Sequence, residues 1–182
     1  MIRNLNFELL RGERVFLHGK NGCGKSTLLH LIRNLAEETG NRMQDHREIE
    51  TRSGLLTVGA GLTISYISQD TGFLSGTLSE YCRTEKLDYS LLLTLLRKLD
   101  FERTQFEKPM ESFSEGQKKK VLIAASFITP AHLYIWDEPL NYIDVFSRMQ
   151  IEQLLLSASP TMLVVDHDVR FQKKLATRTV KL

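Results

Sequence analysis

The run from Gly19 to Thr27, which reads GKNGCGKST, restricts the fold more than any other part of this 182-residue sequence. Its glycines, lysine and serine have the G-x-x-x-x-G-K-[ST] spacing of a loop that surrounds phosphate groups. The apolar run 14–18 before it predicts a short strand, and the run 26–32 after it has helical spacing. A chance glycine turn that carries a lysine is the alternative, but it would not account for the strand and the helix on either side.

The residue types in this loop indicate what it could bind. Gly19, Gly22 and Gly24 let the backbone turn tightly and direct its N–H groups, with the N-terminus of the following helix, at negatively charged oxygens. Lys25 would then reach the β and γ phosphates of a nucleotide, and the hydroxyl of Ser26 would be a ligand of Mg²⁺.

The composition is that of an ordinary globular protein. With 42% hydrophobic and 25% charged residues, the chain can bury one sizeable core, and we expect a single domain over residues 1–182. No apolar run is long enough to cross a bilayer, and a formal charge of +2 is too small to indicate nucleic-acid binding by bulk electrostatics. Two cysteines, Cys23 and Cys82, fit a reducing compartment better than a disulfide framework, so we expect a cytoplasmic protein in which Cys23 contributes only its backbone. A redox role for Cys23 is the alternative.

The other segments of the first hundred residues give weaker patterns. Residues 1–11 alternate apolar and polar side chains, as in a half-buried strand, and 37–47 reads as a polar loop. Strands are expected over 49–51 and 62–67, with a glycine-rich connection between them. The run 77–99 has helical spacing and a broad leucine-rich face, which we interpret as core.

A polar block at 112–117 follows a helical subdomain that we expect over about residues 76–113. The block precedes an apolar helix expected over 121–128. Ser114 therefore stands where a helix N-cap is expected, and capping is its structural explanation.

An apolar strand predicted over 133–137 ends in two adjacent carboxylates, Asp137 and Glu138. Asp137 would hold Mg²⁺ directly or through water, and Glu138 is placed to orient or deprotonate an attacking water. An acidic turn after a strand is the alternative, and the phosphate-binding loop upstream favours the catalytic interpretation.

A second apolar strand, over 162–165, is followed by His167. The carboxyl ends of strands are where α/β sheets gather their ligand chemistry, so His167 could donate a hydrogen bond to a γ-phosphate or to the attacking water. A histidine in a surface turn is the alternative. The final segment, 171–182, predicts a short helix followed by an edge strand.

Together these blocks resemble the ATP-binding cassette (ABC) ATPases over nearly the whole chain. The correspondence runs in order: Gly19 to Thr27 matches Walker A, Gln69 the Q-loop glutamine, Ser114 to Gln117 the signature motif, Asp137 and Glu138 Walker B and its catalytic glutamate, Asn141 to Asp144 the D-loop, and His167 the switch histidine.

The resemblance is greatest to one branch of that superfamily. Residues 138–144, EPLNYID, are similar to the EPTNHLD segment of the ABC-F proteins, and 165–171 resemble the ABC-F ending. The block from 65 to 120 is similar to the second cassette of the antibiotic-resistance, ribosome-protecting ABC-F proteins.

The resemblance implies an α/β fold of the P-loop NTPase class, with a mainly parallel core sheet, antiparallel edge strands and a helical subdomain. It implies ATP and Mg²⁺ as cofactors, and these site residues: Gly19, Asn21, Gly22, Cys23, Gly24, Lys25, Ser26 and Thr27 around the nucleotide; Ser26, Gln69 and Asp137 at the metal; and Glu138, His167 and Gln69 in catalysis.

The resemblance also implies partners. ABC cassettes work in pairs, so Ser114, Gly116 and Gln117 should contact the ATP held by a second cassette, from the same parent chain or from a homodimer. ABC-F proteins reach the ribosome through a charged helical linker, which is missing here, and they do not insert into a membrane.

Three departures from the family pattern affect what is expected. The chain starts too late to hold the aromatic residue that usually stacks on adenine, so we expect an N-terminally truncated domain with weak nucleotide binding, since such stacking is worth about 1 to 3 kcal/mol. Glu115 stands where a small residue is usual and would place negative charge near a phosphate. Lys118 to Lys120 are expected on a solvated helix face, with a surface for a partner or for ribosomal RNA as the alternative.

Two functions therefore remain open. One is an ABC-F translation factor in which ATP-driven closure of paired cassettes relieves inhibition by ribosome-targeting antibiotics. The other is the nucleotide-binding motor subunit of an ABC membrane transporter. A binding module without hydrolysis is a third interpretation, which the presence of both Glu138 and His167 disfavours.

Overall fold

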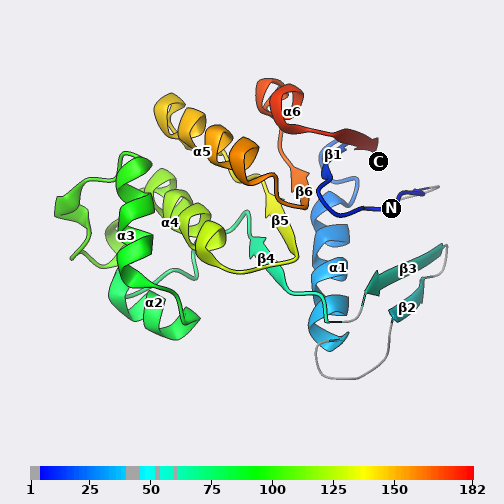
Figure 1. Cartoon of the computed structure of the whole chain (residues 1–182), viewed down its shortest axis with the longest axis horizontal. Helices are drawn as coiled ribbons and strands as arrows, with labels where there is room; N and C mark the ends of the chain where they lie inside the picture. The colour runs from blue at the N-terminus through cyan, green and yellow to red at the C-terminus, as the bar shows by residue number, and fades with distance from the viewer. Residues whose placement is uncertain (1–4, 40–45, 52–53, 60) are drawn as a thin grey trace. The chain divides into compact units, whose positions relative to one another are not determined.

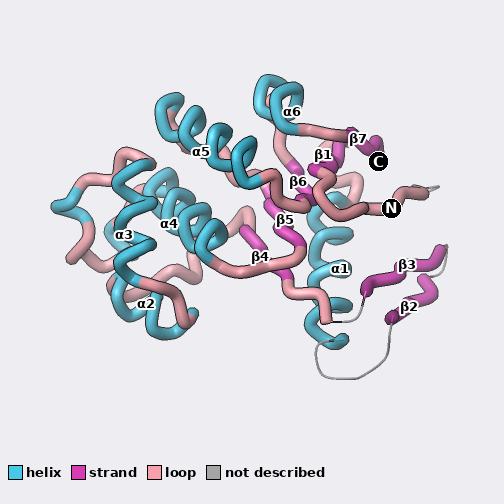
Figure 2. The backbone as a smooth tube through the Cα atoms, viewed as in Figure 1, coloured by secondary structure: helices cyan, strands magenta, loops and turns pink. Residues whose placement is uncertain are grey.

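The computed structural model describes residues 5–39, 46–51, 54–59 and 61–182. The chain forms two compact units, shown in Figures 1 and 2. The first, here the sheet unit, comprises Met1–Tyr66, Pro130–Asp137 and Pro160–Leu182; the second, the helical unit, comprises Ile67–Thr129 and Glu138–Ser159. The single domain over 1–182 and the limits of the helical subdomain stay predictions.

A five-stranded sheet in the order β4-β5-β6-β1-β7 forms the centre of the sheet unit. Its strands are β1 (Arg14–His18), β4 (Ile64–Ile67), β5 (Leu133–Asp137), β6 (Met162–Val165) and β7 (Arg178–Lys181). The pairs β1–β6, β1–β7 and β5–β6 are parallel, so the predicted parallel core is confirmed, and β7 lies at an edge as predicted. The strands appear in magenta in Figure 2.

Helices cover both faces of this sheet. Consecutive residues of a strand point to opposite faces, so each face presents its own apolar side chains to a helix. Val15 and Leu17 pack with Leu29 of α1 (Lys25–Thr39) in one apolar cluster. Phe16, between them, meets Phe171 of α6 (Val169–Leu175) edge to face, with ring centroids 5.5 Å apart. The alternation of β1 therefore places α1 and α6 on opposite faces of the sheet.

A two-stranded antiparallel sheet corrects one sequence-based expectation. β2 (His46–Thr51) pairs with β3 (Gly54–Gly59), although the second segment was expected to be a glycine-rich connection. Val58 of β3 is buried and packs with Leu35 of α1, and this burial outweighs the low strand preference of the flanking glycines. The loop predicted over 37–47 is also shorter, because α1 continues to Thr39 and β2 begins at His46; residues 40–45 lie outside the described chain.

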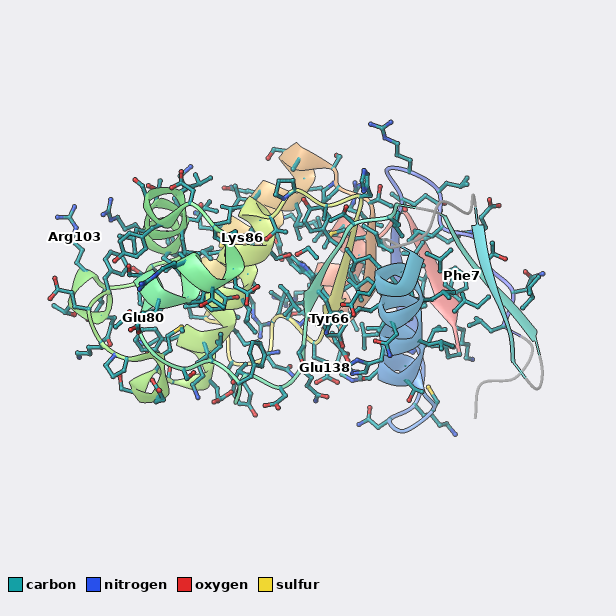
Figure 3. All side chains as sticks on the ribbon, turned by 90° about the horizontal axis from the view of Figure 1, so that it is seen from below. Phe7, Tyr66, Glu80, Lys86, Arg103 and Glu138 are labelled. Atoms are coloured by element: carbon teal, nitrogen blue, oxygen red, sulfur yellow. The ribbon has the colours of Figure 1, made fainter. Side chains whose placement is uncertain are left out.

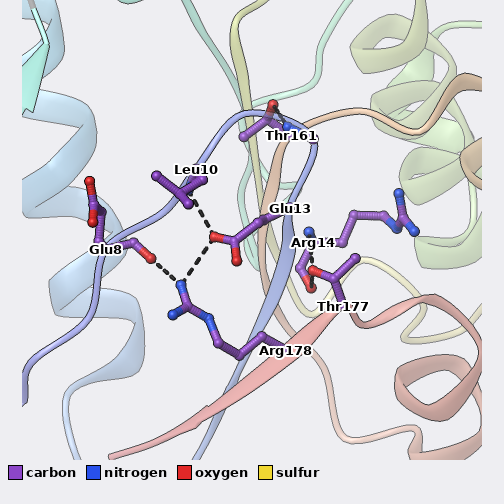
Figure 4. A network of polar contacts seen from close by, with 8 residues as sticks. Glu8, Leu10, Glu13, Arg14, Thr161, Thr177 and Arg178 are labelled. Atoms are coloured by element: carbon purple, nitrogen blue, oxygen red, sulfur yellow. Dashed lines mark hydrogen bonds and ion pairs between the residues drawn. The ribbon is translucent and has the colours of Figure 1, made fainter.

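The strand predicted over 1–11 is wrong for residues 5–10, which are irregular; residues 1–4 lie outside the description. Side-chain contacts take the place of strand pairing there, as Figure 4 shows. The Leu10 amide donates to Glu13 Oε2 over 2.8 Å, and Arg178 of β7 donates to the carbonyl of Glu8 and to Glu13. The half-buried character that the alternation predicts is confirmed, since Phe7 is partly buried against the sheet.

The helical unit contains α2 (Leu78–Glu85), α3 (Tyr89–Lys98), α4 (Glu115–Ile128) and α5 (Val145–Ala158). The helical run predicted over 77–99 is therefore two helices. Lys86 ends α2 in the left-handed conformation with φ of 55°, and Asp88 caps α3 by accepting from the Leu91 amide over 2.8 Å. Figure 3 labels Glu80 in the first turn of α2 and Lys86 at its end.

The leucine-rich face of α3 packs inward only in part. Leu92, Leu96 and Leu99 are buried, whereas Leu91 is 46% exposed. Phe101 continues this core, with its ring edge to face against Phe113 at 5.3 Å between centroids. Within the described residues, none of the helices has both the length and the apolar character that a bilayer crossing requires.

Candidate functional site

Three of the predicted motifs meet at one edge of the sheet. The glycine-rich loop follows β1, His167 follows β6, and Asp137 is the last residue of β5. Because β5, β6 and β1 are adjacent and parallel, their carboxyl ends lie at the same edge. Ligands of open α/β sheets bind at this edge. Lys25 and Asp137, from distant parts of the chain, are therefore on the same side of the sheet unit.

The loop between β1 and α1 has the backbone that its glycines predict. Gly22 and Gly24 have φ of 76° and 106°, values that side-chain-bearing residues rarely adopt. A Cβ on Gly19 would lie 2.8 Å from the sulfur of Cys23 and 3.1 Å from the carbonyl oxygen of Leu182. The side chain of Cys23 thus packs inside the turn. Cys23 contributes this side chain as well as the backbone that the sequence predicts.

The side chain of Lys25 folds back over this loop. Its Nζ donates to the carbonyl oxygens of Gly19 and Lys20 over 2.9 and 3.0 Å, and the residue is only 7% exposed. Burial of an ammonium is costly without such acceptors. Two carbonyls therefore hold the positive charge of Lys25 near the N-terminus of α1. The helix dipole also favours the binding of an anion there.

Asp137 is almost fully buried, at 2% exposure, at the tip of β5. Burial, together with the negative charge of Asp137, raises the pKa of Tyr66 on β4 to about 12, while Arg33 opposes the rise. The Arg33 guanidinium lies 5.1 Å from the centroid of the Tyr66 ring. The hydroxyl of Ser26 and the carboxylate of Asp137 are oxygen donors of the kind that Mg²⁺ prefers, so the donor set fits that ion.

His167 lies in the turn between β6 and α6 and is exposed. Asp168 fixes this turn as the N-cap of α6, because its Oδ1 accepts from the amides of Arg170 and Phe171 over 2.8 and 3.1 Å. Asp166 accepts from the Asp168 amide over 2.8 Å. His167 is thus held at the carboxyl edge of the sheet by a turn with acidic residues on both sides.

In the helical unit, Gln69 and Glu138 are brought together. Gln69 Nε2 donates to Glu138 Oε2 over 2.9 Å, and Asn141 Nδ2 donates to the same oxygen over 2.7 Å. Glu138, labelled in Figure 3, has φ of 49°, a strained value for a residue with a side chain. Two amides and a fixed backbone therefore orient one carboxylate. The predicted role of Gln69 at a metal stays a prediction.

Ser114 caps α4 with a complete capping box. Its hydroxyl accepts from the Gln117 amide over 3.2 Å, and Gln117 Oε1 accepts from the Ser114 amide over 2.9 Å. Gly116 approaches the segment 141–144 so closely that a Cβ there would lie 2.4 Å from the carbonyl oxygen of Tyr142. The first turn of α4 is thereby packed against the segment that follows Glu138.

The expectation for Lys118 to Lys120 is wrong, both as a solvated face and as a surface for a partner or RNA. Lys119 is 1% exposed and donates to the carbonyl oxygen of Ser68 over 2.8 Å. Lys120 is 8% exposed and pairs with Asp144 over 2.7 Å, and Lys118 pairs with Glu115 over 3.1 Å. These lysines serve internal contacts: Glu115 on the same helix is the partner of Lys118, and residues far along the chain supply the acceptors of Lys119 and Lys120.

Sequence reasoning missed the contacts of Glu115 and Asn141. Glu115, expected to place charge near a phosphate, accepts from the hydroxyl of Thr71 over 2.5 Å and pairs with Lys118. These hydrogen bonds, from Thr71 first, lower the pKa of Glu115. The three-residue spacing of Glu115 and Lys118, which places both on one side of a helix, was a sequence signal for their ion pair.

Comparison with known proteins agrees with this arrangement. A family model described as ABC transporter matches residues 2–141. Ribosome protection protein VmlR of Bacillus subtilis is 32% identical over 177 residues, which are 96% of this chain and 30% of VmlR. ATP-binding protein Uup of Caulobacter vibrioides is 29% identical over 191 residues, 100% of this chain and 29% of Uup.

A solved ATP-binding subunit of an ABC transporter superposes with a TM-score of 0.77 at 25% identity, over 97% of this chain and 77% of that subunit. The chain spans about three-tenths of the length of the two curated relatives. The family model covers most of the chain, and the fold and the order of the motifs agree with it. The chain belongs to the ABC transporter family, as one of its ATP-binding cassettes.

Proposed function

We propose that this cassette binds and hydrolyses ATP with Mg²⁺, in partnership with a second cassette, as part of an ABC-F protein that acts on the ribosome. One observation carries the proposal for ATP. The Lys25 loop and the buried Asp137 lie at the carboxyl edge of the same three adjacent strands. A triphosphate and its metal need a cationic cradle and an oxygen ligand at one place, and these residues provide both.

The residues divide the work of hydrolysis between binding and activation. Backbone amides of the loop and Lys25 bind the phosphates, and Ser26 and Asp137 would hold Mg²⁺, which neutralises phosphate charge when bound. Glu138 follows Asp137 directly in the chain and accepts a proton from the attacking water. Gln69 and Asn141 orient that carboxylate through their hydrogen bonds to Oε2. His167 senses or stabilises the γ-phosphate from the turn after β6.

The signature residues support a paired arrangement. Ser114 lies at the N-terminus of α4, a helix of 14 residues, where the helix dipole favours an anion. We assign Ser114, Gly116 and Gln117 to the ATP of a second cassette, as the resemblance to ABC ATPases implies. The chain contains one copy of each motif, so a complete pair needs another cassette.

The ribosomal role is supported by likeness to the ribosome protection protein VmlR and by the ABC-F character of residues 138–144. Work on ribosomes would place the protein in the cytoplasm, and relief of inhibition by antibiotics would be its effect. The alternative is the motor subunit of a membrane transporter, supported by the likeness to a solved ATP-binding subunit of an ABC transporter.

The variant Glu138→Gln, made in the natural protein that carries this chain, tests both parts of the proposal. Removal of the proton acceptor should lower ATP hydrolysis by at least about 100-fold and leave ATP affinity within about threefold. The variant should cosediment with ribosomes in the presence of ATP and release them without it. Glu107→Gln, a change at an exposed residue, is the matched control and should hydrolyse ATP as the wild type does.

The outcomes separate the parts of the proposal. Unchanged hydrolysis in Glu138→Gln would overturn the assigned chemistry. Lost hydrolysis without any association with ribosomes would overturn the ribosomal role and leave the ATPase in place. Association with membrane vesicles instead would favour the transporter alternative.

A further inference from the structure

The helix that carries the signature motif holds two loops of the helical unit by side chains one turn apart. Glu115 and Lys119 lie on one side of α4, and Gly116 and Lys120 lie on the adjacent side of the same helix. The first pair contacts residues 68–71, which include Gln69, and the second contacts the segment after Glu138. These segments carry the donor and the acceptor of the Gln69–Glu138 hydrogen bond.

The contact to the Gln69 loop has two points. The Thr71 hydroxyl donates to Glu115 Oε2 over 2.5 Å, a short charge-assisted bond, and Thr71 is only 2% exposed. Lys119 Nζ donates to the carbonyl oxygen of Ser68 over 2.8 Å. Gln69 lies between Ser68 and Thr71, so its backbone is fixed on both sides by α4.

Burial shows that these contacts are not incidental. Lysine is almost never fully buried unless its charge has partners, and Lys119 is 1% exposed. An apolar side chain at this place would pack without the cost of removing an ammonium from water. What an apolar side chain could not do is donate a directed hydrogen bond to the main chain next to Gln69.

The opposite segment is fixed in a similar way. Lys120 pairs with Asp144 over 2.7 Å, and Gly116 lets the backbone of Tyr142 approach α4. Asn141, which donates to Glu138 Oε2, precedes Tyr142 in the chain. The carboxylate and both of its amide donors are therefore on segments that α4 anchors.

We propose that Glu115 and Lys119 are positioning residues for hydrolysis: through Thr71 and Ser68 they fix the loop that carries Gln69, so that Gln69 meets the Glu138 carboxylate. The inference rests on the proposed ATPase function. It gives Glu115, which accepts from Thr71 and pairs with Lys118, a role in this chain. It also makes α4 a link between the signature serine and the group that activates water.

Thr71 offers the sharpest test because two replacements separate its hydroxyl from its shape. Thr71→Val keeps the shape and loses the donor, whereas Thr71→Ser keeps the donor. In the natural protein at saturating MgATP, Thr71→Val should lower kcat by at least about fivefold with the KM for ATP within about twofold, because the binding loop is untouched. Thr71→Ser should remain within about twofold of wild-type kcat.

Variants of Glu115 complete the test. Glu115→Ala should lower kcat as Thr71→Val does, and the double variant should be no slower than either single variant, since both remove one interaction. Glu107→Ala, at an exposed acidic residue, should leave kcat unchanged.

Equal kcat for Thr71→Val and Thr71→Ser, or additive losses in the double variant, would overturn the positioning role. If Glu138→Gln abolishes hydrolysis in the same assay, such a result leaves the proposed function standing. If Glu138→Gln retains hydrolysis, the proposed function is overturned, and the positioning role with it.

Discussion

At the scale of single residues, Gly116 is a helical position where the close approach of another backbone segment leaves no room for a side chain. In an exposed helix, alanine is favoured over glycine by about 0.5–1 kcal/mol. Here a Cβ would lie 2.4 Å from the carbonyl oxygen of Tyr142, and that oxygen belongs to the backbone and cannot swing aside. The steric cost therefore outweighs the helix preference.

We predict that Gly116→Ala lowers the free energy of unfolding by about 1–3 kcal/mol, the usual range for overpacking. Urea denaturation followed by circular dichroism measures the change. Ser90→Ala, at the second position of α3 and exposed, is the control and should change stability by less than about 0.5 kcal/mol. Equal stability of Gly116→Ala and the wild type would show that the Tyr142 backbone can move away without cost.

At the scale of elements, the pair of Lys120 and Asp144 joins α4 to the start of α5. Asp144 is the N-cap of α5 and accepts from the Ser147 amide over 2.8 Å, and it also pairs with Lys120. Partial burial acts to raise the pKa of Asp144, but the hydrogen bonds from Lys120 and Ser147 outweigh it and lower the pKa from 3.8 to about 2. The ionised carboxylate is thus more stable in the folded chain than in the unfolded one.

This direction fixes a pH dependence. The stabilisation is fully present above the unfolded pKa of 3.8 and is lost as the pH falls through the folded-state pKa of about 2. Since the Asp144 side chain is 46% exposed, solvent screening reduces its contribution to about 1 kcal/mol. Asp144→Asn, which keeps a good N-cap, should therefore be less stable by about 1 kcal/mol at pH 7, and by much less at pH 2.

Stability curves of both proteins from pH 2 to pH 7 check this prediction. Asp88→Asn, which changes the cap of α3 in the same way, is the control and should change stability much less. A difference between Asp144→Asn and the wild type that stays constant through this pH range would contradict the assigned ion pair.

At the scale of the whole molecule, a bound nucleotide should stabilise the fold. A ligand that binds only the folded state adds about 2.7 kcal/mol at a concentration 100 times its dissociation constant, which raises Tm by several degrees. Lys25, held at 7% exposure over the loop, supplies the buried charge that would meet the phosphates. We predict that MgATP raises the Tm of the wild type and not that of Lys25→Ala.

Differential scanning calorimetry with a series of MgATP concentrations gives this result directly. Lys20→Ala is the matched control, because Lys20 is an exposed lysine of the same loop and the loop uses its carbonyl. A Tm that rises equally in Lys25→Ala and the wild type would place nucleotide binding elsewhere.

Local patterns were enough for the buried strands and for the motif residues. The runs 14–18, 133–137 and 162–165 form the strands that their apolar character predicted. A strand buried on both faces is a nearly continuous apolar run, which can be recognised in the local sequence. The spacing of the glycines and Lys25 in the loop, and the two carboxylates at the end of β5, are likewise visible in the sequence itself. The fold class and the motif order followed from these features.

The contacts between distant segments could not be found in this way. The burial of Lys119 depends on the Ser68 carbonyl, 51 residues away, and the close approach at Gly116 depends on where the Tyr142 backbone turns. Charge alone therefore predicts a solvated face for three lysines, although two of them, Lys119 and Lys120, have acceptors in distant segments. Similarly, β3 is a strand because it pairs with β2 and packs on α1, which glycine content does not foretell. Side-chain chemistry is local, but burial and hydrogen-bond partners are properties of the packed chain.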